Sequence, residues 1–153
     1  TKNIMDVNYL VEDTIDSMNS LFEKKDIDVN TELYDDEVFI EGDFNRLKQV
    51  IVNIVKNSME ARKDNDKLSL DIVTKLENGE FSVSITDNGV GMDMSELNNI
   101  GKSFYTTKTK GTGLGVLLSK EIIELHEGNI VYESEKGSGT TVTISFPVLK
   151  DME

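Results

Sequence analysis

Residues 81–92 read FSVSITDNGVGM, a strand pattern that runs into a glycine-containing turn. Its first half alternates apolar and polar residues, which is typical of a half-buried β-strand. The strand ends in a carboxylate, Asp87, and the glycines that follow let the backbone approach a flat ligand closely. Asp87 could then accept a hydrogen bond from an exocyclic amine. When the motif is taken alone, an ordinary Asp-Asn-Gly turn explains the same residues at least as well.

The chain on either side of this stretch alternates helices with pairs of short strands. Apolar spacing predicts helices at residues 7–22, 43–62 and 114–126, the second of them capped by Asp43. Alternating patterns predict strands at 26–33, 37–42, 67–76, 80–87, 129–134 and 140–146, and the first two read as a pair joined by a turn at 35–36. Residues 92–110 are polar and rich in glycine, which indicates a short helix and a long functional lid. The predicted fold class is α+β: a two-layer sandwich in which a mixed, mostly antiparallel sheet packs on helices.

The composition of the chain excludes several classes of function. The 153 residues include 29 acidic and 16 basic side chains, and the net charge of -13 disfavours binding to duplex DNA or to an anionic membrane. The absence of cysteine excludes disulfides, thiolate nucleophiles and zinc–thiolate sites. The single histidine, His126, is expected to cap a helix rather than to bind a metal. We expect one domain that belongs to a longer chain, because the sequence starts at Thr1 without a leader.

Three further features of the sequence bear on chemistry. Asn53 and Asn57 lie one turn apart on the helix at 43–62, and amide oxygens suit Mg²⁺ that also holds phosphate oxygens, although a solvated polar face is the simpler explanation. Lys108 and the run KGTGLG at 110–115 precede a helix N-terminus, which favours an anion, and a flexible hinge is the alternative. The segment GSGT at 137–140 is simply a turn when taken alone.

In their order and spacing, these motifs resemble those of the GHKL ATPase superfamily. The resemblance is closer to the catalytic ATP-binding domain of two-component sensor histidine kinases of the sporulation and nitrogen-regulation types. LKQVIVNIVKNSMEA (47–61) is similar to the family's asparagine box, DNGVGM (87–92) to its first glycine box, KSFYTTK (102–108) to its phenylalanine box and KGTGLG to its second glycine box. Residues 127–147 are similar to its C-terminal hairpin. The resemblance implies the Bergerat fold, with an ATP lid at 95–110.

The resemblance also implies roles for individual residues. Asn57 would hold Mg²⁺ on the phosphates of ATP or ADP with help from Asn53, and Lys108 would reach the terminal phosphate. These three are the expected catalytic residues. Asp87 would bind the adenine amine, and Thr140 would support it through the aspartate or a water. The other residues expected to contact the nucleotide are Ala61, Gly89, Gly91, Met92, Phe104, Thr107, Gly111, Thr112, Gly113, Leu114 and Gly115.

Two positions depart from the patterns of relatives. Glu60 stands where many sensor kinases have a lysine, and it is expected to face solvent or to lie one layer behind the residues that touch the phosphates, because a carboxylate would repel them. Asn53 stands where the hydrolysing relatives have a general-base glutamate. An amide cannot take a proton from water at neutral pH, so hydrolysis is expected to be slow. Catalysis would rest on Mg²⁺, lysine and helix-end electrostatics.

The function implied is transfer of the γ-phosphoryl group of Mg-ATP to a histidine on a dimeric helical hairpin that this sequence lacks. Residues 1–25 would be the connecting helix towards that phosphoacceptor domain, and residues 26–153 the catalytic domain. The isolated domain would be a cytoplasmic monomer that does not phosphorylate itself and contacts neither nucleic acid nor membrane. The intact protein would be a homodimer acting on a response regulator, and its membrane anchoring stays open. The alternatives are a GHKL ATP hydrolase, an anti-sigma-type serine kinase, and a degenerate domain that binds a partner without nucleotide.

Overall fold

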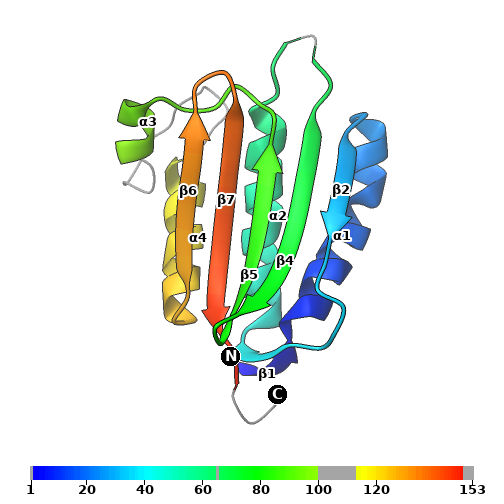
Figure 1. Cartoon of the computed structure of the whole chain (residues 1–153), viewed down its shortest axis with the longest axis vertical. Helices are drawn as coiled ribbons and strands as arrows, with labels where there is room; N and C mark the ends of the chain where they lie inside the picture. The colour runs from blue at the N-terminus through cyan, green and yellow to red at the C-terminus, as the bar shows by residue number, and fades with distance from the viewer. Residues whose placement is uncertain (1, 65, 100–112, 150–153) are drawn as a thin grey trace.

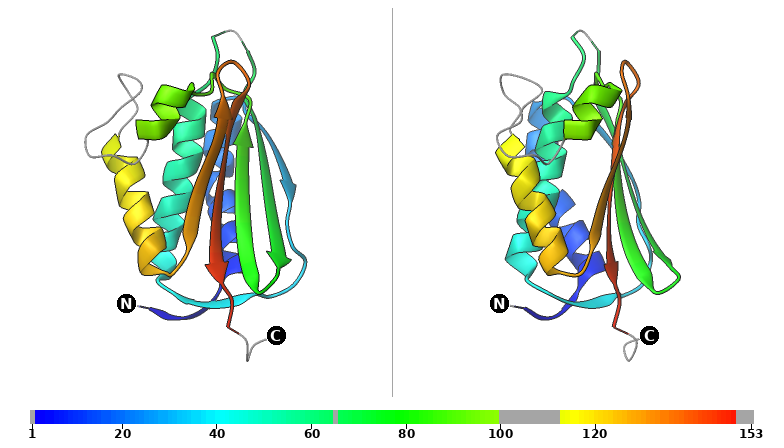
Figure 2. Two further views of the ribbon diagram at one scale, coloured as in Figure 1. Left: turned by 60° about the vertical axis from the view of Figure 1, so that its left-hand side comes forward. Right: turned by 90° about the vertical axis from the view of Figure 1, so that its left-hand side faces the viewer.

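The computed structural model describes residues 2–64, 66–99 and 113–149, which form one layer of sheet and one layer of helices (Figure 1). The elements in chain order are β1 (Asn3–Asp6), α1 (Val7–Lys24), β2 (Asp28–Glu32), β3 (Phe39–Gly42), α2 (Phe44–Glu60), β4 (Ser69–Glu77), β5 (Glu80–Asp87), α3 (Met94–Asn99), α4 (Gly113–Leu125), β6 (Asn129–Glu135) and β7 (Gly139–Pro147). Figure 2 shows α1, α2 and α4 on the same face of the main sheet. This is the predicted two-layer sandwich.

The main sheet has five strands in the order β2-β4-β5-β7-β6. Only β2 and β4 run parallel, and the other neighbouring strands pair antiparallel, so the sheet is mixed and mostly antiparallel as predicted. In this register Asp87, at the end of β5, lies between Leu70 of β4 and Thr140 of β7. The sheet therefore places Asp87 beside the first residues of the last strand.

The predicted pairing of the strands at 26–33 and 37–42 with each other is wrong. β2 pairs with β4, and β3 pairs antiparallel with β1, a strand that the sequence pattern does not predict. The chain between β2 and β3 does not form a hairpin turn, because residues of α1 and β4 hydrogen-bond to it. The side chain of Asn8 in α1 donates to the carbonyls of Tyr34 at 2.7 Å and Asp36 at 3.0 Å, and the hydroxyl of Thr74 in β4 accepts from the amide of Tyr34 at 2.7 Å.

The core lies between the helices and the inner face of the sheet. Each helix presents an apolar stripe to it, because residues three and four apart share a helix face. In α2 the buried apolar residues are Leu47, Val50, Ile51, Ile54 and Val55. In α1 they are Val7, Leu10, Val11, Ile15, Met18 and Phe22. Both stripes belong to one cluster with Phe81, Val83 and Ile85 of β5, so the described part of α1 packs against the rest of the domain.

None of the helices in the described residues combines the length and the apolar composition that crossing a membrane requires.

Candidate functional site

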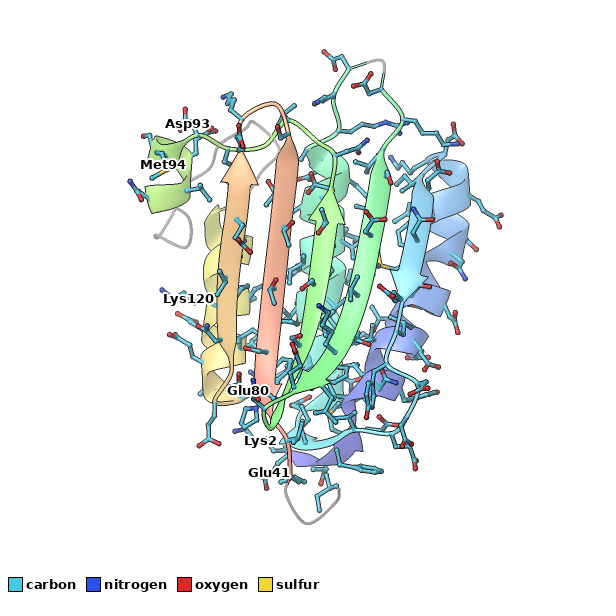
Figure 3. The ribbon with its side chains drawn as sticks, in the orientation of Figure 1. Lys2, Glu41, Glu80, Asp93, Met94 and Lys120 are labelled. Atoms are coloured by element: carbon cyan, nitrogen blue, oxygen red, sulfur yellow. The ribbon has the colours of Figure 1, made fainter. Side chains whose placement is uncertain are left out.

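The described residues that are expected to bind a nucleotide lie at one end of the molecule. The C-terminal ends of α2 and β5, the start of β7 and the helix α3 meet there (Figure 1). Figure 3 shows Asp93 and Met94 at this end, whereas Lys2, Glu41 and Glu80 lie at the opposite end. The site is thus built where several elements of the core stop together.

Asp87 is the buried carboxylate of this site, with 4% of its surface exposed. Its Oδ1 accepts hydrogen bonds from the backbone N–H groups of Gly89 at 2.8 Å and Thr140 at 3.3 Å. A carboxylate is stable away from water only when donors satisfy it, so these bonds fix its position. A carboxylate has about four lone-pair sites on its two oxygens, which gives it capacity to accept from a ligand as well.

The loop after β5 is held between the end of α2 and the hairpin of β6 and β7. The amide of Val90 donates to the carbonyl of Ala61 at 2.7 Å, and the amide of Gly137 donates to the carbonyl of Val90 at 2.7 Å. A Cβ atom at Gly89 would lie 2.4 Å from the carbonyl oxygen of Ala61. At Gly91, where φ is +69°, it would lie 2.1 Å from the carbonyl oxygen of Glu135. In this structure the glycines therefore make room for protein backbone on both sides of the loop.

The side chain of Asn88 anchors the same loop to the first residue of β4 and to the chain just before it. Its Oδ1 accepts from the amide of Ser69 at 2.9 Å, and its Nδ2 donates to the carbonyl of Lys67 at 3.1 Å. The sequence motif contains Asn88, but sequence reasoning assigned it no role. An asparagine after a strand is a general turn signal, and its partners are far away in the chain.

Ser134 links the loop to the start of β7. Its hydroxyl accepts from the amide of Met92 at 2.8 Å, donates to the carbonyl of Gly139 at 2.9 Å and lies 2.7 Å from the hydroxyl oxygen of Thr140. Sequence reasoning missed Ser134. The available signal was the alternation along β6. Ser134 alternates with exposed residues and lies on the same face of the strand as Ile130 and Tyr132, which pack against the core.

The two asparagines of the predicted metal site lie in the C-terminal half of α2, with Asn57 in its last turn. Asn53 is half-buried and Asn57 is exposed. Across the described ranges, neither amide side chain hydrogen-bonds to another residue. The C-terminal end of a helix carries partial negative charge, which favours a nearby cation. Glu60 is exposed, as the sequence predicts.

The loop ends in a capping box at α3. The amide of Asp93 donates to the carboxylate of Glu96 at 3.0 Å, and the amide of Glu96 donates to the carboxylate of Asp93 at 2.9 Å. This reciprocal pair satisfies two backbone donors at the start of a helix. It gives Met92 and the preceding loop a defined end, and it confirms the short helix predicted after residue 92.

Several predicted site residues lie outside the described residues, namely Phe104, Thr107, Lys108, Gly111 and Thr112, together with most of the predicted lid. Gly113, Leu114 and Gly115 form the first turn of α4. Figure 2 shows that α4 begins at the end of the molecule where the loop and α3 lie. The free N–H groups of such a helix start favour an anion.

His126 belongs to the opposite end of the domain. It is buried, its Nδ1–H donates to the carbonyl of Ile122 at 2.8 Å, and its Nε2 accepts from the amide of Asp43 at 2.9 Å. Because Nε2 accepts, we assign the proton to Nδ1. The imidazole thus ties the end of α4 to the start of α2, which is a structural role.

A concavity of about 270 Å³ lies away from Asp87 and is lined by Asp6, Asn8, Tyr9, Glu12, Asp35, Asp36 and Glu37. Its carboxylates would repel a triphosphate, so this concavity does not suit a nucleotide. Within the described residues, no group of three or more His, Cys, Asp or Glu side chains could hold a metal ion.

A protein-family model describing histidine kinase-, DNA gyrase B- and HSP90-like ATPases matches residues 42–150. The chain therefore belongs to this ATPase family, and membership implies that it binds ATP.

Within the family, the chain is similar to sporulation kinase E of Bacillus subtilis (strain 168), with 39% identity over 96% of the chain and 20% of the relative. It is similar to the solved catalytic domain of the histidine kinase ThkA, with a TM-score of 0.83 and 28% identity over 96% of this chain and 95% of that one. The same fold recurs in ThkA solved in complex with the response regulator protein TrrA, with a TM-score of 0.80 and 23% identity over 99% of this chain and 43% of that one. The chain spans only a fifth of the length of sporulation kinase E.

Proposed function

We propose that the chain is the ATP-binding catalytic domain of a sensor histidine kinase of the sporulation type. In this role it transfers the γ-phosphoryl group of Mg-ATP to a histidine on a separate helical hairpin. The observation that carries the proposal is the buried carboxylate of Asp87, held by two backbone amides at the end of β5. The kinship with sporulation kinase E and the catalytic domain of ThkA supports it.

Asp87 binds adenine in this proposal. A buried carboxylate is an acceptor only, and the 6-amino group of adenine is a donor, so the two form a charge-assisted hydrogen bond. Gly91 and Met92 follow it along the chain and line the base. Thr140, whose amide already donates to Asp87, supports the carboxylate from β7.

The residues present fit a magnesium ion at the end of α2. Asn57 is exposed there, its amide oxygen is a hard neutral ligand, and the helix end favours positive charge. Mg²⁺ typically takes one or two protein groups and completes its shell with phosphates and water. When bound, the ion would neutralise charge on the phosphates. Asn57 holds it in our proposal, and Asn53 assists from one turn earlier.

The remaining residues act on the phosphates. Lys108 reaches the terminal phosphate, and the backbone amides at the start of α4 bind the phosphate chain. In our proposal Gly111 wraps the phosphate chain with them, Phe104 packs over the site and excludes water, and Thr107 and Thr112 contact the nucleotide. Asn53 supplies no general base, so water is not activated and the γ-phosphoryl group is kept for the acceptor histidine.

The chain acts with partners that it does not contain. We propose that residues 1–25 connect it to the phosphoacceptor hairpin, while α1 also packs on the core of this domain. The intact protein forms a homodimer through that hairpin and passes the phosphoryl group to a response regulator. The regulator-bound structure of ThkA, which has the same fold, motivates the last step.

Phosphotransfer in trans tests this function. The chain is incubated with Mg²⁺ and γ-labelled ATP, with or without the phosphoacceptor hairpin of a sporulation-type kinase supplied as a second chain. We expect acid-labile label on the hairpin, none on a hairpin whose acceptor histidine is replaced by glutamine, and none on the domain alone. Acid-stable label on serine, or rapid release of phosphate without transfer, would contradict the proposal in favour of a serine kinase or a hydrolase.

A further inference from the structure

The hydroxyl group of Ser134 makes three hydrogen-bond contacts in the candidate site. It accepts from the amide of Met92 at 2.8 Å, donates to the carbonyl of Gly139 at 2.9 Å and lies 2.7 Å from the hydroxyl oxygen of Thr140. No motif and no step of the proposed function uses this side chain. Its contacts nevertheless join the loop after β5 to the residue that supports Asp87.

The number of protons on the Ser134 and Thr140 hydroxyls determines the direction of each hydrogen bond. A serine hydroxyl has one proton and two lone pairs. The carbonyl of Gly139 can only accept, so it takes the serine proton, and the amide of Met92 occupies one lone pair. The other lone pair then accepts the proton of Thr140 across the 2.7 Å contact. This leaves the Thr140 oxygen with lone pairs only.

We propose that Ser134 is a positioning residue that keeps Thr140 a hydrogen-bond acceptor and thereby makes the site select a 6-aminopurine over a 6-oxopurine. The inference rests on the proposed function, because it takes Asp87 to bind the amine of adenine. Thr140 is the register partner of Asp87 and its amide is 3.3 Å from the carboxylate, so both side chains belong to one site.

The chemistry of the two bases explains the selection. Adenine offers a donor at C6, which suits a pair of acceptors. Hypoxanthine offers an oxygen at C6, which would face two acceptors with no proton between them. Without the Ser134 hydroxyl, Thr140 keeps its own proton and can turn it towards a C6 oxygen. The C6 oxygen of hypoxanthine then weakens binding less than it does in the unmutated chain.

The test compares binding of ADP and IDP by titration calorimetry, with Mg²⁺ present. These nucleotides carry the same phosphates, so contacts to the phosphates cancel in the ratio of their dissociation constants. We expect the unmutated chain to favour ADP, and Ser134→Ala to reduce that preference about 2- to 10-fold, the effect of one neutral hydrogen bond. Ser134→Thr keeps a hydroxyl and should preserve the ratio. Ser138→Ala, at an exposed serine of the same hairpin, is the matched control.

A second variant covers the case in which Ser134→Ala does not fold. Thr140→Val removes the other hydroxyl of this pair, the proposed acceptor itself, so it should reduce the ratio by a similar factor. Adding Ser134→Ala to it should change the ratio no further, because the two residues act as one unit.

Three results would overturn the inference. One is an unchanged ratio in folded Ser134→Ala, even if both affinities fall, since that is a purely structural effect. Another is an unchanged ratio in Thr140→Val. The third is equal binding of ADP and IDP by the unmutated chain, which leaves the proposed function standing. Failure of the unmutated chain to bind either nucleotide would instead contradict the proposed function, and the inference with it.

Discussion

At the scale of single residues, Asn57 is the proposed ligand of Mg²⁺, whereas Asn53 stands where the hydrolysing relatives have a general-base glutamate. We expect Asn57→Ala to weaken binding of Mg-ADP about 10- to 100-fold, since it removes a ligand of a charged group, and Asn53→Ala to weaken it less. Because Asn57 is exposed, its replacement should leave the free energy of unfolding within about 0.5 kcal/mol. Titration calorimetry with Mg²⁺ and with EDTA measures the effect. Equal affinity of the unmutated chain under both conditions would rule out the metal role.

At this scale, the sequence predicts only the residues whose signal is local. Asp87 stands out because a strand pattern ends on it and glycines follow, and the structure places it buried at the end of β5. Ser134 and Asn88 do not stand out, because their partners lie on other strands and in other loops. A side chain that bonds distant backbone has no characteristic spacing, so it becomes visible only after the strands are paired.

The loop after β5 yields a prediction at the scale of elements. Gly91→Ala and Gly79→Ala both place a Cβ atom at a positive φ, of 69° and 77°, which costs roughly 1–2 kcal/mol of stability in each. Only at Gly91 does that Cβ also meet backbone, at 2.1 Å, whereas nothing lies within 4 Å at Gly79. We therefore expect Gly91→Ala to lose more stability and to bind ADP more weakly, and Gly79→Ala to bind ADP normally. Urea unfolding and calorimetry check both, and equal effects of the two variants would refute the tight packing of the loop.

The strand β6 yields a prediction on pH. Burial raises the pKa of Tyr132 to about 12, above the ordinary value of about 10. As the pH rises, Tyr132 therefore loses its proton in the unfolded chain before it does so in the folded chain. The contribution of the protonated phenol to the free energy of unfolding is complete below pH 10 and is lost as the pH rises towards 12. The loss amounts to about 2–3 kcal/mol at most.

Urea unfolding between pH 8 and pH 12 measures this loss, and Tyr132→Phe should remove it from the pH profile. Tyr9→Phe changes an exposed tyrosine and should leave the profile as it is. An identical fall in stability for Tyr132→Phe and the unmutated chain would count against a raised pKa of this partly buried phenol on β6.

The sequence also predicts most elements, because helices and hairpins depend on neighbours in the chain. The helix capped by Asp43 and the strand ending at Asp87 are found within a residue or two of their predicted bounds. The strand partners of β1, β2 and β3, which precede α2, are not predictable in the same way. β2 pairs with β4 across an intervening helix, and β1 has only Ile4 and Met5 as apolar residues, too few to show alternation.

On the scale of the whole molecule, the candidate site depends on several elements that stop at one end. The last turn of α2, the end of β5 and the start of β7 are bonded to one loop, and Lys2, Glu41 and Glu80 lie at the other end of the molecule (Figure 3). The core that holds these elements rigid is contributed by both helices and sheet. Nucleotide binding is therefore a property of the assembled fold, and no single motif could supply it.

In the proposed function Asp87 binds the adenine of ATP, and calorimetric titration of Mg-ATP into the unmutated chain and into Asp87→Asn measures what this contact contributes. Asparagine keeps an oxygen that can accept from Gly89 and Thr140, so the variant should fold normally. It loses the negative charge, and its amide N–H groups oppose the adenine amine. We expect the affinity to fall about 10- to 150-fold, the cost of a charge-assisted hydrogen bond. An unchanged affinity in a folded Asp87→Asn chain would contradict the claim.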